Sequence, residues 1–142
     1  MATHPKWMRR FLSEEDFAAI TRAIHAAEAG TTAEIRVHIE RRVPRRLFRR
    51  TPDALTRARH VFTRLGMHRA PERHGVLLYL AIDDRKLAVV GDEGIHGRVG
   101  DSHWQGVRDR MVQNLRAGTP RDAILGAIQE FGRALAEHYP RA

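Results

Sequence analysis

The chain has no cysteine among its 142 residues, which excludes disulfide bonds and cysteine-ligated zinc. It also has no apolar run near the ~20 residues that a membrane-spanning helix needs. Its longest apolar run, Val76–Ile82, has the length of a strand. The opening residues, MATHPKWMRRF, include basic side chains but no apolar stretch of the kind found in signal peptides. We therefore expect a cytoplasmic chain without a transmembrane segment.

Motifs that carry catalytic chemistry are scarce as well. The sequence contains no G-x-S-x-G, no HExxH and no P-loop. Ser13 and Ser102 stand before helical patterns, where serine acts as a cap rather than as a nucleophile. The nine histidines show no zinc-binding spacing. The residues alone therefore do not indicate a specific enzymatic reaction.

Positive charge, in contrast, is in excess, with a net charge of +8. Much of the excess lies in the Arg-rich loop 41–50, which reads RRVPRRLFRR. Such a field attracts anions, including nucleic acid, acidic lipid and acidic proteins. The candidate anion-binding residues in this loop are Arg45, Arg46, Arg49 and Arg50. A solvated loop without a partner is the alternative interpretation.

Four segments have the apolar periodicity of amphipathic helices, with caps at their starts and Gly or Pro after their ends. They are Glu14–Ala29, the segment from Thr51-Pro52-Asp53 to Gly66, the segment from Asp101 or Ser102 to Gly118, and the segment from Thr119-Pro120 to Pro140. We expect the buried stripe of the second helix to be Leu55, Ala58, Phe62 and Leu65. The glycine-rich stretch GDEGIHGRVGD is too short and irregular to predict a helix.

Three segments predict strands. Glu34–Glu40 alternates between apolar and polar residues, which is typical of a strand with one wet face. Val76–Ile82 is almost wholly apolar, as in a central strand, and a turn joins it to a returning strand at Leu87–Val90.

The expected order of elements is therefore α-β-α-β-β-α-α. The first β-α-β unit predicts a parallel crossover, so the small sheet is mixed. A three-layer α/β/α sandwich buries every apolar stripe. We expect one domain over residues 1–142, with an N-terminal tail at 1–12.

Several quoted segments together resemble the TPM domain family. They are FLSEEDFAAITRAIHAAEAGTTAEIRVHIE, RLGM, HGVLLYLAIDDRKLAVVGDEGIHGRVGDSHW and AILGAIQEFGRALAEHYP. Their order and spacing carry the resemblance from Phe11 to Pro140, and the pattern is similar to compact bacterial members that consist of little beyond the domain. The family is named for a thylakoid acid phosphatase, a photosystem II repair protein and a worm acetylcholine-receptor auxiliary protein. The resemblance implies an α/β/α sandwich, and family members are linked to phosphatase activity, divalent-metal binding, photosystem repair and receptor modulation.

One candidate site lies at the turn after the central strand. In open α/β sheets, ligands bind at the carboxyl ends of strands. Asp83 and Asp84 supply two carboxylates there for Ca²⁺ or Mg²⁺, and Arg85 is a candidate for an anionic group. The alternative is a hairpin turn that uses Asp for its turn chemistry.

A second candidate site surrounds the glycine-rich stretch. Asp92, Glu93 and Asp101 bracket it, and such carboxylates suit a hard divalent cation. Glu34 is expected near the same end of the sheet because the hairpin reverses direction. A glycine-shaped connection with an acidic helix cap is the alternative.

These observations lead to three hypotheses. The first is a noncatalytic module that binds a divalent cation, a protein partner or both. The second is a metal-assisted phosphatase in which Asp83 and Asp84 place the ion and Arg85 binds the phosphate. The third is binding of an anionic lipid surface or nucleic acid through the Arg-rich loop. No organic cofactor is expected.

Overall fold

The computed structural model describes residues 4–44, 53–69 and 74–141. Its centre is a three-stranded sheet in the order β1-β2-β3. β1 (Glu34–Glu40) runs parallel to β2 (Gly75–Ala81), and β3 (Lys86–Gly91) returns antiparallel to β2. The mixed sheet and the hairpin that the sequence predicts are both confirmed.

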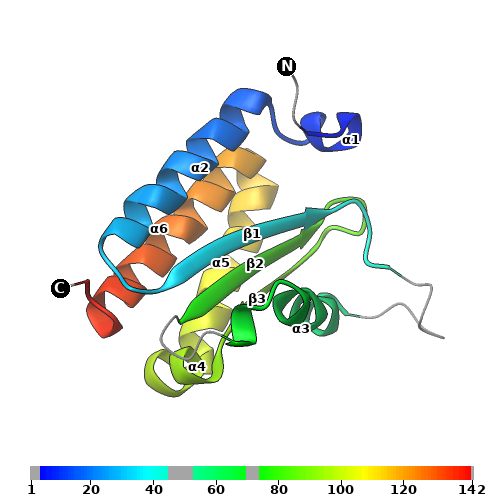
Figure 1. The fold of residues 1–142 in the computed structure, drawn as a ribbon. Coiled ribbons are helices and arrows are strands. Elements are labelled where there is room, and N and C mark those ends of the chain that lie inside the picture. Colours follow the sequence, from blue (N-terminus) through cyan, green and yellow to red (C-terminus); the bar gives the residue numbers. More distant parts are fainter. Residues whose placement is uncertain (1–3, 45–52, 70–73, 142) are drawn as a thin grey trace.

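Helices cover both faces of this sheet (Figure 1). One face packs against α2 (Glu14–Ala29), α5 (Asp101–Ala117) and α6 (Pro120–His138). The other face packs against α3 (Ala54–Arg64). Shorter elements are α1 (Lys6–Arg9), the 3₁₀ turn Met67–Arg69 and α4 (Glu93–Val99). The predicted α/β fold is therefore confirmed.

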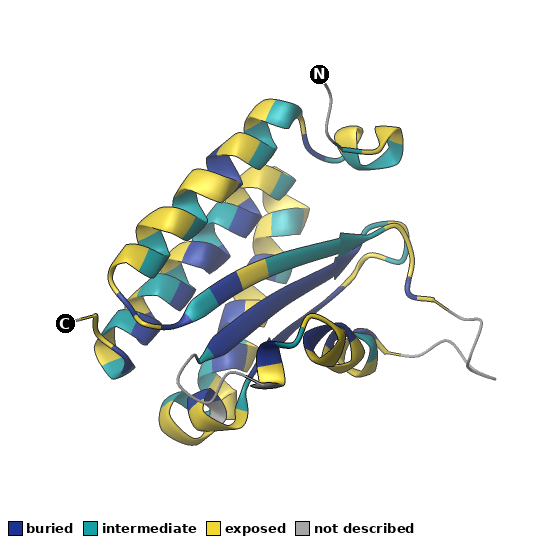
Figure 2. Ribbon diagram, viewed as in Figure 1, coloured by how far each residue is buried: buried dark blue, intermediate teal, exposed yellow. Residues whose placement is uncertain are grey.

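The alternation of β2 side chains divides the core into two clusters. Val76, Leu78 and Leu80 point into the larger cluster, whose centre includes Phe131 of α6. The smaller cluster lies under α3 and holds the side chains of Leu77, Tyr79 and Ala81 from β2. Every residue of β2 is buried, as Figure 2 shows, because helices cover both faces of the central strand.

The start and the buried stripe of α3 differ from the sequence prediction. Asp53 is the N-cap, and its side chain accepts a hydrogen bond of 2.7 Å from the Thr56 amide. The expected cap, Thr51-Pro52, lies outside the described residues. Leu55 and Leu65 were expected in the stripe but are 40% and 37% exposed, because the buried face of α3 consists of other residues. These are Ala54, Ala58, Val61 and Phe62.

Two further expectations, for the glycine-rich stretch and for the start of α5, are wrong. The glycine-rich stretch forms α4, because Asp92 accepts a hydrogen bond from the Ile95 amide and the Ile95 side chain is fully buried. The N-cap of α5 is Gly100, at φ +91°, rather than Asp101 or Ser102. Within the described parts of the chain, no helix is both long and apolar enough to cross a bilayer.

Candidate functional site

The two edges of the sheet differ in how their backbone is protected. On β1, the outward amide of Ile35 donates a hydrogen bond of 2.9 Å to the Glu28 carboxylate of α2. One face of β1 also carries the charged side chains Glu34, Arg36 and Glu40. Charged side chains and covered amides are devices that keep an edge strand from pairing with another chain. β1 is therefore protected at Ile35 and along its charged face.

β3 is the unprotected edge. Its sequence, KLAVVG, has one charge at its start and is otherwise apolar or glycine. The Asp92 amide donates to the Gly75 carbonyl, which fixes the phase of the β2–β3 ladder. With this alternation of hydrogen-bonded pairs, the N–H and C=O groups of Ala88 and Val90 bond to β2. The N–H and C=O groups of Leu87 and Val89 point away from the sheet. β3 therefore offers a short row of outward backbone donors and acceptors.

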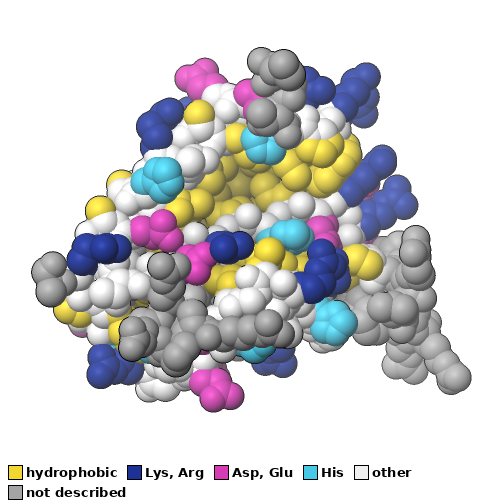
Figure 3. Space-filling view, viewed as in Figure 1, with side chains coloured by type: hydrophobic (Ala, Val, Ile, Leu, Met, Phe, Trp, Pro, Cys, Tyr) yellow, Lys and Arg dark blue, Asp and Glu magenta, His cyan; other side chains and the backbone are white. Residues whose placement is uncertain are grey.

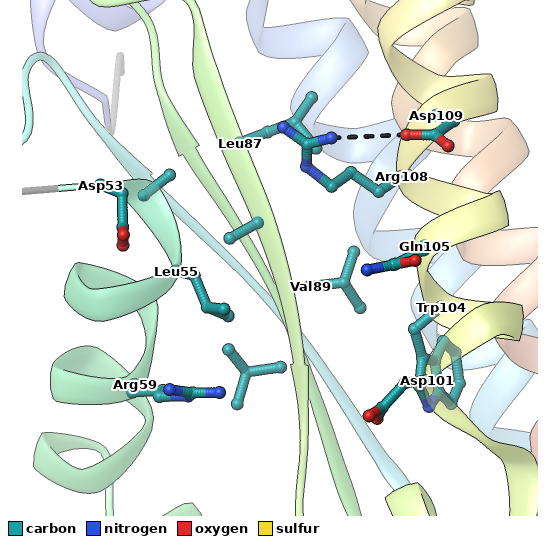
Figure 4. A pocket seen from close by; sticks show the side chains of 13 residues that line it. Asp53, Leu55, Arg59, Leu87, Val89, Asp101, Trp104, Gln105, Arg108 and Asp109 are labelled. Atoms are coloured by element: carbon teal, nitrogen blue, oxygen red, sulfur yellow. Dashed lines mark hydrogen bonds and ion pairs between the residues drawn. The ribbon is translucent and has the colours of Figure 1, made fainter.

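A groove of ≈ 620 Å³ follows this open edge, between α3 and α5. Figure 4 shows β3 in the middle, with side chains of α3 on one side and of α5 on the other. Leu55, exposed on α3, faces the groove from one wall, and Gln105 of α5 does so from the other. The apolar exposure of Leu55 thus coincides with the open strand edge.

Charged side chains stand on both walls of the groove. Asp53 and Arg59 come from α3, and Arg108 and Asp109 come from α5. The Thr56 amide holds the pKa of Asp53 below its usual range, so its carboxylate is committed to capping α3. The Arg108 Nη1 lies 3.4 Å from the Asp109 Oδ1. A ligand in the groove would therefore meet side chains of both charges, Arg59 on one wall and Arg108 with its partner Asp109 on the other.

The acidic turn after β2 lies against the chain that follows β1. The Asp83 Oδ2 accepts hydrogen bonds from the Nε atoms of Arg41 and Arg42, at 3.1 and 3.4 Å. The Asp84 Oδ2 accepts one of 2.8 Å from the Val43 amide. Both carboxylates therefore join the carboxyl ends of β1 and β2. Asp83 and Arg85 also line a cavity of ≈ 820 Å³ beside this turn.

The second acidic group lies at the opposite end of the sheet. The Asp92 carboxylate accepts hydrogen bonds from the amides of Gly75 and Ile95, at 2.9 and 3.0 Å. Glu34 pairs with Gly75 in the register of β1 and β2, which confirms its expected place at this end. Its carboxylate contacts Arg36 at 2.5 Å.

The predicted metal ligands are thus divided between the two ends of the sheet. Glu93 is exposed in the first turn of α4, and Asp101 lines the groove beside β3. In residues 4–44, 53–69 and 74–141, no three His, Asp or Glu side chains gather in a group that fits a metal ion. Arg45, Arg46, Arg49 and Arg50 lie outside the described residues.

A half-buried polar cluster on the α3 side of the sheet was missed from the sequence. The Glu40 carboxylate accepts two hydrogen bonds from Arg57, at 2.5 and 3.1 Å, and one of 2.7 Å from the Tyr79 hydroxyl. His38 Nε2 lies 3.2 Å from the same carboxylate. His38 and Tyr79 are cross-strand partners with stacked rings. The cluster joins α3 to the two parallel strands.

The environment of this cluster sets its protonation. Burial raises the pKa of Glu40, but the hydrogen bonds from Arg57, Tyr79 and His38 outweigh it and leave that pKa below its usual value. Burial and the bond to Glu40 raise the pKa of the Tyr79 hydroxyl. The cluster therefore holds a carboxylate and a neutral phenol at neutral pH. Tyr79, a polar side chain in an otherwise apolar strand, was the signal for it.

Comparisons with known proteins agree with this architecture. The family model of the TPM domain matches residues 8–134. The chain belongs to the TPM domain family. This TPM domain is similar to the BA42 protein from the psychrophilic bacterium Bizionia argentinensis, with 34% sequence identity and a TM-score of 0.79. The match covers 92% of this chain and 85% of the BA42 chain.

A second solved structure shares the fold of this TPM domain. The N-terminal domain of the cg2496 protein from Corynebacterium glutamicum is 15% identical, with a TM-score of 0.64. That match covers 95% of this chain and 86% of the other. Among curated proteins there is no match.

Proposed function

We propose that this TPM domain is a protein-binding module that adds an extended segment of its partner to β3. The observation that carries the proposal is the open edge of β3 at the base of the groove between α3 and α5. Strand addition supplies affinity through main-chain hydrogen bonds and specificity through alternate side chains. The outward groups of Leu87 and Val89 supply those hydrogen bonds here.

The groove walls define the chemistry of the partner. An extended segment would turn alternate side chains towards α3 and towards α5. On the α3 side they would meet the apolar Leu55 and the cationic Arg59. On the α5 side they would meet Gln105 and Arg108. The partner is therefore an extended segment with β-branched or aromatic residues at its centre and polar residues at its flanks, because Asp101 and Asp109 line the groove together with the two arginines.

Selection of peptides against the immobilised domain tests this proposal. A displayed library of random peptides about ten residues long should yield sequences with this alternation. We expect Leu55→Glu to weaken a selected peptide at least tenfold, because it places charge in the groove. Thr63→Glu is the matched control, since Thr63 is exposed on the same helix but does not line the groove. N-methylation of every second peptide amide should abolish binding when the methylated amides are those that face β3. Methylation of the other set of alternate amides should leave binding intact.

Two results would contradict strand addition. One is equal weakening by Leu55→Glu and Thr63→Glu. The other is undiminished binding of peptides whose amides are N-methylated in both phases, because such peptides lack the donors for a strand ladder.

Divalent-cation binding and phosphatase activity remain predictions from the sequence. A cation at the acidic turn would replace the Arg41 and Arg42 guanidinium groups on Asp83. Ca²⁺ or Mg²⁺ would then shift the backbone NMR signals of Asp83 and Asp84 first, and Asp84→Asn would remove the effect. Hydrolysis of a model phosphoester that disappears in the doubly substituted Asp83→Asn, Asp84→Asn chain would support the phosphatase hypothesis.

A further inference from the structure

The cavity beside the acidic turn differs from the groove along β3 in the side chains that line it. Its volume is ≈ 820 Å³, within the roughly 300–1,000 Å³ of typical small-molecule pockets. Apolar side chains from α5, the sheet and the segment after α1 line much of it. They are Phe11, Leu80, Ile82, Leu87, Val112 and Leu115.

Apolar surface is also exposed on the face of the molecule that carries β1 (Figure 3). Figure 3 shows hydrophobic side chains gathered in a hollow between the N-terminal helices and β1, with Lys and Arg side chains on its right-hand side. Phe17 and Ile24 of α2 and Val37 and Ile39 of β1 are only partly buried, and they pack against the same apolar cluster as Phe11, Val112 and Leu115 of the cavity lining. Contiguous exposed apolar surface is typical of binding sites.

The charged residues of the cavity favour an anion. Three cations line it, namely Arg85, Lys86 and Arg116, against one carboxylate, that of Asp83. Arg41 and Arg42 already neutralise Asp83 from the side of β1. All three lining cations are exposed, so they stand at the mouth of the cavity rather than in its apolar interior.

The backbone of Arg85 supports a role for its side chain. Arg85 has φ +53°, in the left-handed region that favours glycine or asparagine. Its amide donates a hydrogen bond of 3.1 Å to the Ile82 carbonyl and closes the hairpin turn. Turn geometry alone would favour glycine at this position. The turn therefore does not explain the arginine, and its guanidinium group is available for another role.

We propose that this cavity binds an amphipathic anion, with a single acyl chain on the apolar lining and a carboxylate among Arg85, Lys86 and Arg116. The ligand class follows from charge complementarity at the mouth and from the apolar lining behind it. A short anion such as acetate lacks the apolar area that drives binding, and a cationic amphiphile would meet like charges.

Titration of the ¹⁵N-labelled chain with dodecanoate, below its critical micelle concentration, tests the proposal. We expect shifts concentrated at Ile82–Leu87 and Val112–Arg116. Acetate, and dodecyltrimethylammonium, which has the same tail with a positive head, should produce no such shifts. Decanoate should bind up to about tenfold more weakly than dodecanoate, since two buried methylenes account for that factor. A parallel titration with phosphatidylglycerol vesicles tests whether the site binds a membrane surface instead of a monomeric ligand.

Two variants separate the cavity from general charge effects. Arg116→Ala should weaken dodecanoate about tenfold, the effect of one charge-assisted hydrogen bond. Arg110→Ala removes an exposed arginine of the same helix that lines neither the cavity nor the groove, and it should leave the affinity unchanged. Arg85→Gly should weaken dodecanoate while raising Tm, because glycine relieves the left-handed backbone.

Several outcomes would overturn this assignment. They are the absence of dodecanoate binding, equal binding of the cationic amphiphile, shifts centred on Ala88–Val90 and α3, and equal weakening by Arg116→Ala and Arg110→Ala. Binding to phosphatidylglycerol vesicles without binding of monomeric dodecanoate would also overturn it, in favour of a membrane surface.

Discussion

Arg57→Ala should lower the free energy of unfolding by about 3 kcal/mol, because it leaves the Glu40 carboxylate without its main partner. The side chains of Arg57 and Glu40 are only 12% and 16% exposed, so solvent cannot fully replace the lost hydrogen bonds. For a domain of this size, the loss corresponds to a fall in Tm of roughly 6–12 °C. Chemical denaturation at neutral pH measures it.

Arg64→Ala is the matched control for this prediction. Arg64 is an exposed arginine on the same helix, and its loss should change stability by no more than about 0.5 kcal/mol. A comparable loss of unfolding free energy in both variants would contradict the prediction. It would mean that the loss comes from removing a charge or from the helix propensity of α3, rather than from the contacts of Arg57 with Glu40.

The pH dependence of the Arg57 effect has a definite sign. The folded pKa of Glu40 lies below its unfolded value, so its contribution is complete above that unfolded value of about 4.3. The contribution is lost as the pH falls through the folded pKa. The stability gap between the native chain and Arg57→Ala should therefore close in acid. A gap that stays constant down to acid pH would contradict the assigned ionisation.

Gly132→Ala should destabilise the fold by about 2 kcal/mol, although alanine is the better helix former. Gly132 lies where α6 crosses α2, and a Cβ atom there would stand 2.9 Å from the Cβ of Ala27. The two helices pack against each other, so relief requires them to move apart. Thermal denaturation measures the effect, and Ala27→Gly in the same chain should restore part of the loss.

Gly126 on the same helix provides a control of opposite sign. A Cβ atom at Gly126 would meet nothing closer than the Asn114 Nδ2, at 4.0 Å. Gly126→Ala should therefore stabilise the chain by up to about 1 kcal/mol through helix propensity. Stabilisation by both substitutions would show that α2 and α6 are not in close contact at Gly132.

Local patterns predicted the strands and the long helices well. Ser13 and Thr119 cap α2 and α6 as expected, because their hydroxyl groups accept hydrogen bonds from nearby amides. The strict alternation of Glu34–Glu40 gave the bounds of β1, and the apolar run gave β2 to within one residue. These features depend on neighbours in sequence, which a single sequence contains.

Features that depend on tertiary contacts were harder to predict. α4 forms despite its glycines because Ile95 is buried against the rest of the fold. Leu55 was expected inside, but its place on α3 turns it towards the open edge of β3. The Glu40–Arg57–Tyr79 cluster required the parallel register of β1 and β2, which local pattern does not contain.

The candidate sites also differ in whether they depend on local sequence or on tertiary contacts. The sequence predicted where Asp83, Asp84 and Arg85 lie, at the carboxyl end of β2, because turn chemistry is local. It did not indicate the groove along β3, since the groove arises from helices on opposite faces of an edge strand. The sheet order that leaves β3 at an edge, together with its uncharged LAVV sequence, was the available signal.

Amide hydrogen exchange along β3, with and without a selected peptide, tests the protein-binding proposal most directly. In the free chain, the amides of Leu87 and Val89 should exchange quickly, while those of Ala88 and Val90 are protected by β2. Bound peptide should slow Leu87 and Val89 at least tenfold and leave the other two unchanged. Unchanged exchange at Leu87 and Val89 in the peptide complex, or new protection along β1 instead, would contradict strand addition to β3.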